Sequence, residues 1–201
     1  MKIYDISQEV LSSQVYPGDP VPEKKVLSSI DNGDLYNLTA FSMCCHNGTH
    51  IDAPNHFIKD GLTVDQLCLN SLIGLAYVAE HEGTVTKEDA IRIIKNAKDT
   101  NLESSKRILI KGDVEVSLEA AKVFAASDVL LVGNEPQTVG PKNAPMNVHV
   151  ELLSKNIVLL EGICLAEVKK GVYFLNAAPL NLRGSDGSPC RAILIEGIFE
   201  N

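Results

Sequence analysis

Short apolar runs rich in β-branched residues alternate along the chain with segments whose apolar residues recur at helical spacing. Each run is bounded by Gly, Asn, Asp or Pro, which is typical of a β-strand between turns. Several runs are apolar throughout, and this indicates strands that are buried on both faces. The pattern predicts seven strands, at Ile3–Val10, Leu75–Ala79, Arg107–Lys111, Val129–Gly133, Ile157–Ile163, Val172–Leu175 and Arg191–Ile195.

The clearest helical pattern lies between the second and third of these strands, over Thr86–Lys98. It starts at a threonine that can cap a helix and has an acid three residues later. Four apolar residues form a stripe along it, namely Ala90, Ile91, Ile94 and Ala97. The spacing predicts a helix with one buried face.

Two further helices are predicted at Leu118–Ala126 and Asn147–Ser154. Strands interleaved with helices predict an α/β fold. The long connections at 11–45 and 134–147 favour a mixed sheet or partial β-barrel core flanked by helices over a simple doubly wound sheet. These connections are also where we expect a functional site.

The composition is that of an ordinary globular chain. Apolar residues make up 45% and charged residues 22% of the 201 residues, and no repeat divides them, so we expect one domain over residues 1–201. A net charge of −8 without a basic run argues against nucleic acid and anionic membranes as partners. No apolar stretch is long enough to span a bilayer.

Two features predict a cytoplasmic protein. The amino terminus, Met-Lys-Ile-Tyr-Asp-Ile-Ser, places an acid where a secretory signal needs its apolar core. The five cysteines are an odd number without Cys-x-x-Cys spacing, which predicts reduced thiols.

Three of the five histidines fall within eleven residues, in the string His-Asn-Gly-Thr-His-Ile-Asp-Ala-Pro-Asn-His. A glycine and a proline in this string disfavour a helix. In an extended chain, His46, His50 and Asp52 differ by even numbers, so their side chains would point the same way. Pro54 would then end the strand and leave His56 turned back nearby.

Two imidazoles and a carboxylate are the donors that hold Zn²⁺, Mn²⁺ or Fe²⁺ while leaving coordination positions open. An open position indicates catalysis rather than a structural metal. The competing interpretation is a polar surface loop in which Asp52 makes a turn. The concentration of three histidines and an acid in one short string favours the metal site.

The string HNGTHIDAPNHF resembles the HxGTHxDxPxHF signature of the cyclase family, which includes bacterial kynurenine formamidases and isatin hydrolases. These are metal-dependent hydrolases that act on amide-like bonds. Residues 5–7 and 16–19 resemble the amino-terminal block of the family, and residues 178–180 and 187–192 resemble its carboxy-terminal block. The resemblance covers nearly the whole chain and implies a cyclase-like fold of the swivelling β/β/α type.

The resemblance also implies roles for individual residues. His46, His50 and Asp52 match the first metal-binding group of the family, and His56 matches the histidine assigned as general acid or base. Thr49 and Asn55 are expected to support these side chains.

His149 and Glu161 match the histidine and glutamate that complete the metal site, with the same twelve-residue separation as in formamidases. Asp52 would then bridge two ions, and Glu161 would be both a ligand and a catalytic residue. The residues give independent support, because Glu161 is an acid in an otherwise apolar strand and a buried carboxylate needs a cation partner. The alternatives are that Glu161 faces solvent or an arginine, and that His149 is a core histidine. His81 is given no role.

These observations predict a hydrolase that cleaves an amide-type C–N bond in a small molecule, such as an N-formyl compound, an arylformamide or a cyclic amide. A metal-activated water would attack the carbonyl and His56 would carry the proton to the leaving nitrogen. Zinc is the expected ion, with manganese second, and one or two ions are accommodated. The alternative is a non-hydrolytic protein that binds a metal or small ligand, or a lyase or cyclase of the same fold.

The substrate itself is left open by the sequence. The chain has no Trp and only 5% aromatic residues, whereas family formamidases line their pockets with aromatic side chains. A smaller amide, formamide derivative or cyclic imide fits as well, with Tyr16, Tyr36 and Phe57 as candidate pocket walls. The resemblance also implies a homodimer or tetramer, with the amino-terminal loop extending to a neighbouring subunit.

Overall fold

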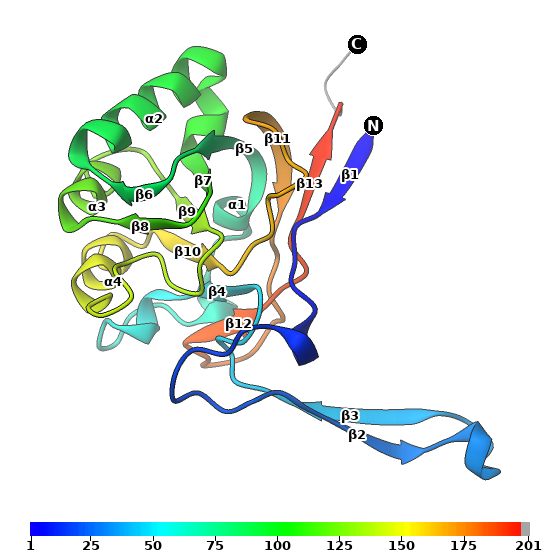
Figure 1. Ribbon diagram of the computed structural model, residues 1–201. Helices are drawn as coiled ribbons and strands as arrows, with labels where there is room; N and C mark the ends of the chain where they lie inside the picture. Colours follow the sequence, from blue (N-terminus) through cyan, green and yellow to red (C-terminus); the bar gives the residue numbers. More distant parts are fainter. Residues whose placement is uncertain (198–201) are drawn as a thin grey trace.

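A nine-stranded mixed sheet forms the centre of the protein in this computed structural model, which describes residues 1–197 (Figure 1). The sheet curls into a half-barrel, and helices flank it. In spatial order its strands are β1 (Lys2–Asp5), β13 (Ile193–Glu196), β11 (Gly171–Asn176), β5 (Ile73–Glu80), β7 (Arg107–Lys111), β9 (Leu131–Asn134), β10 (Val158–Glu161), β4 (His50–Asp52) and β12 (Gly187–Pro189). Within this sheet β5, β7, β9 and β10 run parallel to one another, and the other pairings are antiparallel. The predicted α/β class with a mixed, partly barrel-like sheet is therefore confirmed.

All seven predicted strands are present, but the strands predicted at Ile3–Val10 and Ile157–Ile163 are shorter than predicted, and the second of these spans only Val158–Glu161. The first strand ends at Asp5, and the chain then passes through a 3-10 turn at Val10–Ser12. Further 3-10 turns lie at Ile30–Asn32, Pro54–His56, Val64–Gln66 and Leu102–Lys106.

Three helices, α2 (Lys87–Thr100), α3 (Leu118–Ala125) and α4 (Met146–Leu153), cover one face of the sheet (Figure 1). A fourth helix, α1 (Leu69–Leu72), is a single turn that leads into β5. None of the helices in residues 1–197 is long and apolar enough to cross a bilayer.

Helix α2 begins as predicted, with Thr86 and Asp89 forming a reciprocal capping box. The predicted stripe was wrong at Ile91, which is half exposed, whereas Ile93 is buried. The buried positions follow an i, i+3, i+4, i+7 pattern, and Ile91 lies about 100° away from the first of them.

The segment 11–45, which the sequence predicts as a loop, contains an antiparallel hairpin of β2 (Glu23–Ser28) and β3 (Leu38–Ser42). This hairpin projects from the body of the protein (Figure 1). Because nearly all of its residues are exposed, neither face has the alternation that marks a strand in a sequence. A small parallel pair, β6 (Gly83–Val85) and β8 (Val114–Val116), was also missed.

Apolar residues pack on both faces of the central sheet. Along β10, Leu159 belongs to the core beneath the helices, whereas Val158 and Leu160 belong to the core on the opposite face. Strand alternation therefore places Glu161 on the helix-covered face, where α4 lies. The Glu161 side chain is accordingly buried, with 3% of its surface exposed.

Candidate metal centre

Strand β4 brings His50 and Asp52 beside Glu161. The strand is paired with β10 so that His50 lies opposite Glu161 and Asp52 lies opposite Leu159. Residues that are directly opposite in a sheet point to the same face, so the three polar side chains converge beneath the helices. His149, on α4, projects onto the same place from above the sheet.

His46 reaches this cluster by a route that the sequence argument did not predict. It lies in a turn rather than in the strand, and Gly48, with a φ of +63°, redirects the chain before β4 begins at His50. The even spacing of His50 and Asp52 does place them on one face, but His46 joins them through the turn. A left-handed glycine interrupts the extended backbone that the parity argument assumes.

The first histidine–carboxylate group contains His46, His50 and Asp52. His46 Nδ1 lies 2.8 Å from Asp52 Oδ1, and His50 Nε2 lies 3.4 Å from the same oxygen. His50 Nδ1 donates to the carbonyl of Gly48 at 3.0 Å, which leaves Nε2 directed at the carboxylates.

The second group contains Asp52, His149 and Glu161. His149 Nε2 lies 3.2 Å from Glu161 Oε1 and 3.5 Å from Asp52 Oδ2, while His149 Nδ1 donates to the carbonyl of Pro145 at 2.9 Å. Asp52 is therefore shared, with one oxygen in each group. Within each group, the candidate ligand atoms lie within 4.8 Å of one another.

Burial and charge act in opposite directions on these side chains. Burial by itself lowers the pKa of His50 and His149, but hydrogen bonds and charge from Asp52 and Glu161 raise the pKa to about 10 and about 11, respectively. Burial raises the pKa of Asp52, yet its histidine neighbours hold that pKa well below the ordinary value. The cluster therefore holds two buried carboxylates in their ionised form.

The donor set fits a divalent cation. Asp52 Oδ2 is buried and accepts no hydrogen bond, with His149 Nε2 facing it at 3.5 Å, so this oxygen is free to bind a cation. Imidazole nitrogens and carboxylate oxygens are ligands for zinc and manganese. Both histidine rings on β4 and α4 use their second nitrogen to bond a backbone carbonyl, which is the usual support of a metal-binding histidine.

Without metal, the protein should lose stability as the pH rises from about 6.5 toward 10. The folded chain binds protons at His50 and His149 more tightly than the unfolded chain does, so the free energy of unfolding falls with pH. The stabilisation from these two protonated histidines is complete below the histidine pKa of the unfolded chain. It is lost as the pH approaches their pKa in the folded chain. Urea unfolding of chelator-treated protein between about pH 6.5 and pH 8.5 measures it. In His149→Gln, the free energy of unfolding should fall less steeply with pH. A urea midpoint that rises with pH in the parent protein would contradict the raised pKa of these histidines.

His56 lies just outside the two groups. It ends the 3-10 turn Pro54–His56, its side chain is 27% exposed, and its ring stacks on His46 with centroids 4.1 Å apart. A pocket of about 230 Å³ opens beside it, with Tyr16 and Phe57 among its walls. Tyr36, the third predicted wall, does not line this pocket: it lies in the projecting hairpin, between β2 and β3, and is 58% exposed.

The two residues expected to support the site have different surroundings. Thr49 Oγ1 donates to the carbonyl of Gly162 at 2.6 Å and so joins the start of β4 to the end of β10. Asn55 donates its backbone N–H to the carbonyl of Leu62.

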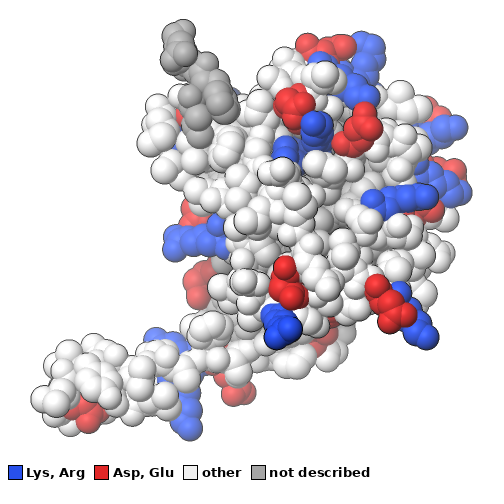
Figure 2. Space-filling model, turned by 180° about the vertical axis from the view of Figure 1, so that it is seen from behind, with Lys and Arg blue, Asp and Glu red and all other residues white. Residues whose placement is uncertain are grey.

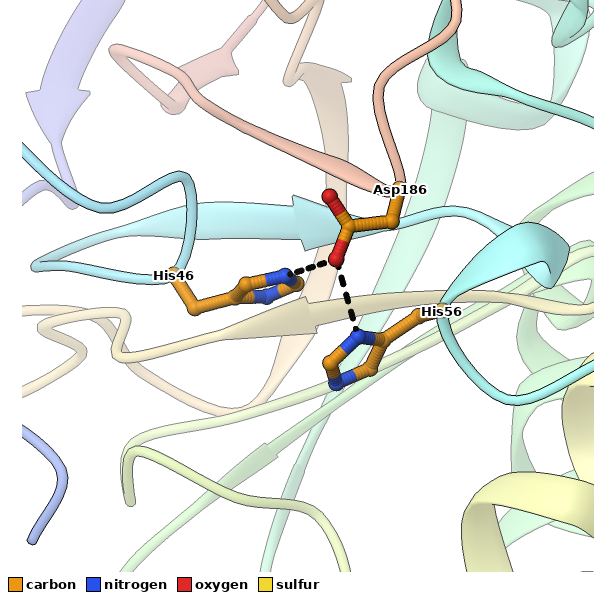
Figure 3. A group of neighbouring side chains, drawn as sticks. All are labelled: His46, His56 and Asp186. Atoms are coloured by element: carbon orange, nitrogen blue, oxygen red, sulfur yellow. Dashed lines mark hydrogen bonds and ion pairs between the residues drawn. The ribbon is translucent and has the colours of Figure 1, made fainter. Parts of the chain in front are cut away.

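Sequence reasoning missed Asp186, which contacts both His46 and His56. Its Oδ2 lies 3.0 Å from His46 Nε2 and 3.2 Å from His56 Nδ1 (Figure 3). The available signal was its position directly before residues 187–192, which resemble the carboxy-terminal block of the family. Gln137 and Thr138, from the long 134–147 connection, were also missed and line the pocket.

Comparison with known proteins identifies the class to which this fold and donor set belong. A family profile described as "Putative cyclase" matches residues 4–140. A kynurenine formamidase of Erythrobacter litoralis (strain HTCC2594) is 30% identical over 209 residues, covering 97% of this chain and 94% of that protein. A solved structure described as a potential metal-dependent hydrolase with cyclase activity is 26% identical, with a TM-score of 0.79 and 96% of each chain covered. Isatin hydrolase A from Labrenzia aggregata shares the fold, with a TM-score of 0.81 at 17% identity, and the match covers 98% of this chain and 94% of that one.

The fold is thus that of a class that includes a potential metal-dependent hydrolase. The chain belongs to the cyclase family, because the family profile matches well over half of it and a relative of similar length is 30% identical. The family resemblance predicted from the sequence is confirmed.

Proposed function

We propose that this protein is a metal-dependent hydrolase that cleaves an amide-type C–N bond in a small molecule. The observation that carries this proposal is the convergence of two histidine–carboxylate groups on Asp52 beside a pocket that also holds His56, a histidine outside both groups. The relatives named as a kynurenine formamidase and an isatin hydrolase support the same reaction class.

His46, His50 and Asp52 would hold one divalent ion, and Asp52, His149 and Glu161 would hold a second. We propose zinc for these positions, with manganese as the second choice, because both accept nitrogen and oxygen ligands. When bound, the ion supplies Lewis acidity, lowering the pKa of water from about 15.7 toward about 7 and polarising a carbonyl. Glu161 contributes to catalysis through its place in the second group, where the Val139 N–H orients it by donating to Oε1 at 2.7 Å.

His56 is the proposed proton carrier. The water oxygen forms a bond to the carbonyl carbon, the C–N bond breaks, and the proton lost by the water must arrive on the leaving nitrogen. His56 is only partly exposed, lines the same pocket as the donor histidines and stacks on His46, so it lies beside both the donor groups and the space for the substrate. A histidine held in this position can accept the proton from one side and release it on the other.

The pocket favours a small substrate. Its volume of about 230 Å³ is below the range of roughly 300–1,000 Å³ that is common for sites of drug-sized ligands. Its apolar walls are Tyr16, Phe57 and Pro145, and Gln137 and Thr138 provide polar groups. We therefore propose an N-formyl compound, a compact arylformamide or a cyclic amide.

Metal analysis followed by a substrate panel tests the proposed reaction. The purified protein should contain zinc or manganese and should hydrolyse a member of a panel of N-formyl compounds, simple amides, lactams and lactones. Chelation should remove the activity and the ion together, and readdition of zinc or manganese should restore both. Metal with tight ligand binding but no turnover would point to a non-hydrolytic protein, and the absence of both metal and turnover would refute the proposal.

We propose further that the protein forms a homodimer or tetramer in the cytoplasm. An isolated two-stranded hairpin is marginally stable in water, and the hairpin segment exposes many apolar side chains. These include Val21, Val26, Leu27, Ile30, Leu35, Tyr36, Leu38 and Phe41.

The cysteines and the surface charge support the other two parts of this proposal. Five free cysteines fit a reducing compartment such as the cytoplasm. Basic and acidic side chains are interspersed over the face in Figure 2, which gives nucleic acid no basic surface there.

A further inference from the structure

Asp186 lies on the far side of the His46 ring from Asp52, one residue before β12. One of its oxygens, Oδ2, faces both His46 Nε2 and His56 Nδ1 (Figure 3). We propose that Asp186 is a positioning residue that selects the ring nitrogen at which each of these two histidines carries its proton. This inference rests on the proposed function, since it concerns the histidines of that site.

For His46 the carboxylate fixes which nitrogen is free to bind a cation. His46 Nδ1 faces Asp52 Oδ1 at 2.8 Å and belongs to the first donor group, whereas Nε2 faces Asp186 at 3.0 Å. A neutral imidazole has one N–H and one lone pair, so a carboxylate that accepts the N–H at Nε2 leaves the lone pair at Nδ1. With a cation held between His46 Nδ1 and Asp52 Oδ1, the lone pair must lie at Nδ1, and Asp186 would then accept the N–H at Nε2 and fix this arrangement.

In His56, Asp186 Oδ2 faces the other ring nitrogen, Nδ1 instead of Nε2. Here Nδ1 donates to Asp186 at 3.2 Å, so the lone pair lies at Nε2. The stacked rings of His46 and His56, inclined by 28°, hold both imidazoles against the one carboxylate. Asp186 thus gives His56 a nitrogen that can accept a proton, and couples its orientation to that of a candidate metal ligand.

The local backbone is built to bring Asp186 to this position. Its carbonyl accepts from the Ala53 N–H at 2.9 Å, which ties it to the chain between β4 and His56. The following residue must be glycine, because a Cβ at Gly187 would lie 2.5 Å from His46 Cε1. The Asp186 side chain is 45% exposed, so the fold does not depend on burying it. A variant at this position is therefore expected to fold.

Histidine tautomers provide a test that requires no substrate. In ¹⁵N-histidine-labelled protein, two-bond ¹H–¹⁵N spectra should show His56 as the Nδ1–H tautomer, with or without zinc. Zinc-loaded protein should show His46 protonated at Nε2. In Asp186→Ala, His56 should shift toward the Nε2–H form that free histidine prefers. An unchanged His56 tautomer in this variant would overturn the inference even if the enzyme proved to be a hydrolase.

Metal affinity and kinetics extend the test. At saturating zinc, Asp186→Ala and Asp186→Asn should lower kcat by about 10- to 100-fold with little change in KM, and should weaken zinc binding by about tenfold. In a His56→Ala background, Asp186→Ala should still weaken zinc binding but should lower the residual kcat no further. Loss of one bound ion per chain, with unchanged tautomers, would instead make Asp186 a metal ligand and would overturn its positioning role.

Asp65→Asn is the matched control. Asp65 is an exposed acid that accepts the Gly184 N–H at 2.9 Å, so it holds the same turn without contacting either histidine. This variant should keep the parental tautomers, zinc affinity and kcat. If Asp65→Asn lost as much activity as Asp186→Asn, the effect would belong to the placement of the turn and not to the carboxylate.

Discussion

Asp52→Asn should release the metal and abolish turnover together. The substitution keeps the size and shape of the side chain but replaces the ionised oxygens by a neutral amide. Asp52 is the residue common to both donor groups, with Oδ1 facing His46 and His50 and Oδ2 facing His149. Loss of its charge therefore weakens both groups at once.

We expect the kcat/KM of this variant to fall by more than about 100-fold, beyond what the loss of a supporting residue causes. Metal content by mass spectrometry of the native protein and hydrolysis of the best substrate from the panel are the two measurements. Glu161→Gln is an informative comparison. It removes a charged donor of the second group and changes a contact to His50, whose Nε2 lies 3.4 Å from Glu161 Oε2, but it keeps all three donors of the first group, which should still bind an ion.

Asp99→Asn provides the matched control for this experiment. Asp99 is an exposed acid on α2 that pairs with Lys95, and it undergoes the same acid-to-amide change. It should retain the metal and the parental rate. If Asp52→Asn kept its ions and its turnover with an unchanged circular dichroism spectrum, the central place of Asp52 in the site would be refuted.

His56→Ala should separate metal binding from turnover. His56 lies outside the two groups that share Asp52, so its removal leaves their donor atoms in place. The variant should bind metal as the parent does. Loss of a positioned proton carrier should lower kcat by about 10²- to 10⁴-fold.

Two further measurements make this prediction specific. Added imidazole should restore part of the lost rate, because the truncated side chain leaves room in a pocket that is open to solvent. His81→Ala is the control: His81 bonds the carbonyl of Thr84 outside the pocket and should be dispensable. A His56→Ala protein with full activity would show that the proton follows another path.

The sequence was most informative where periodicity and burial coincide. All seven predicted strands and the three longer helices are present, because each buries an apolar face and its pattern records that burial. The hairpin of β2 and β3 was missed for the same reason, since an exposed hairpin has no buried face to leave a pattern. Ile91 was misassigned because one apolar residue beside a stripe looks like part of it.

The convergence of the site was predicted only in part. The buried acid of β10 and the histidine string indicated a metal site, and the structure places His46, His50, Asp52, His149 and Glu161 together. The route of His46 through a left-handed Gly48 was not predicted, because spacing alone does not show where an extended backbone is interrupted. Asp186 was missed because it is 140 residues from His46 along the chain, and no local pattern relates the two.

The sequence by itself determined the strand and helix pattern, the family to which the chain belongs and the chemical types of the donors. These follow from local spacing and side-chain chemistry, which the order of residues records directly. Only the tertiary structure decided which side chains share an atom, such as Asp52 between two donor groups and Asp186 between two histidines. Such contacts depend on the register of β4, β10 and β12 and on the packing of α4, and these are set by the whole sheet.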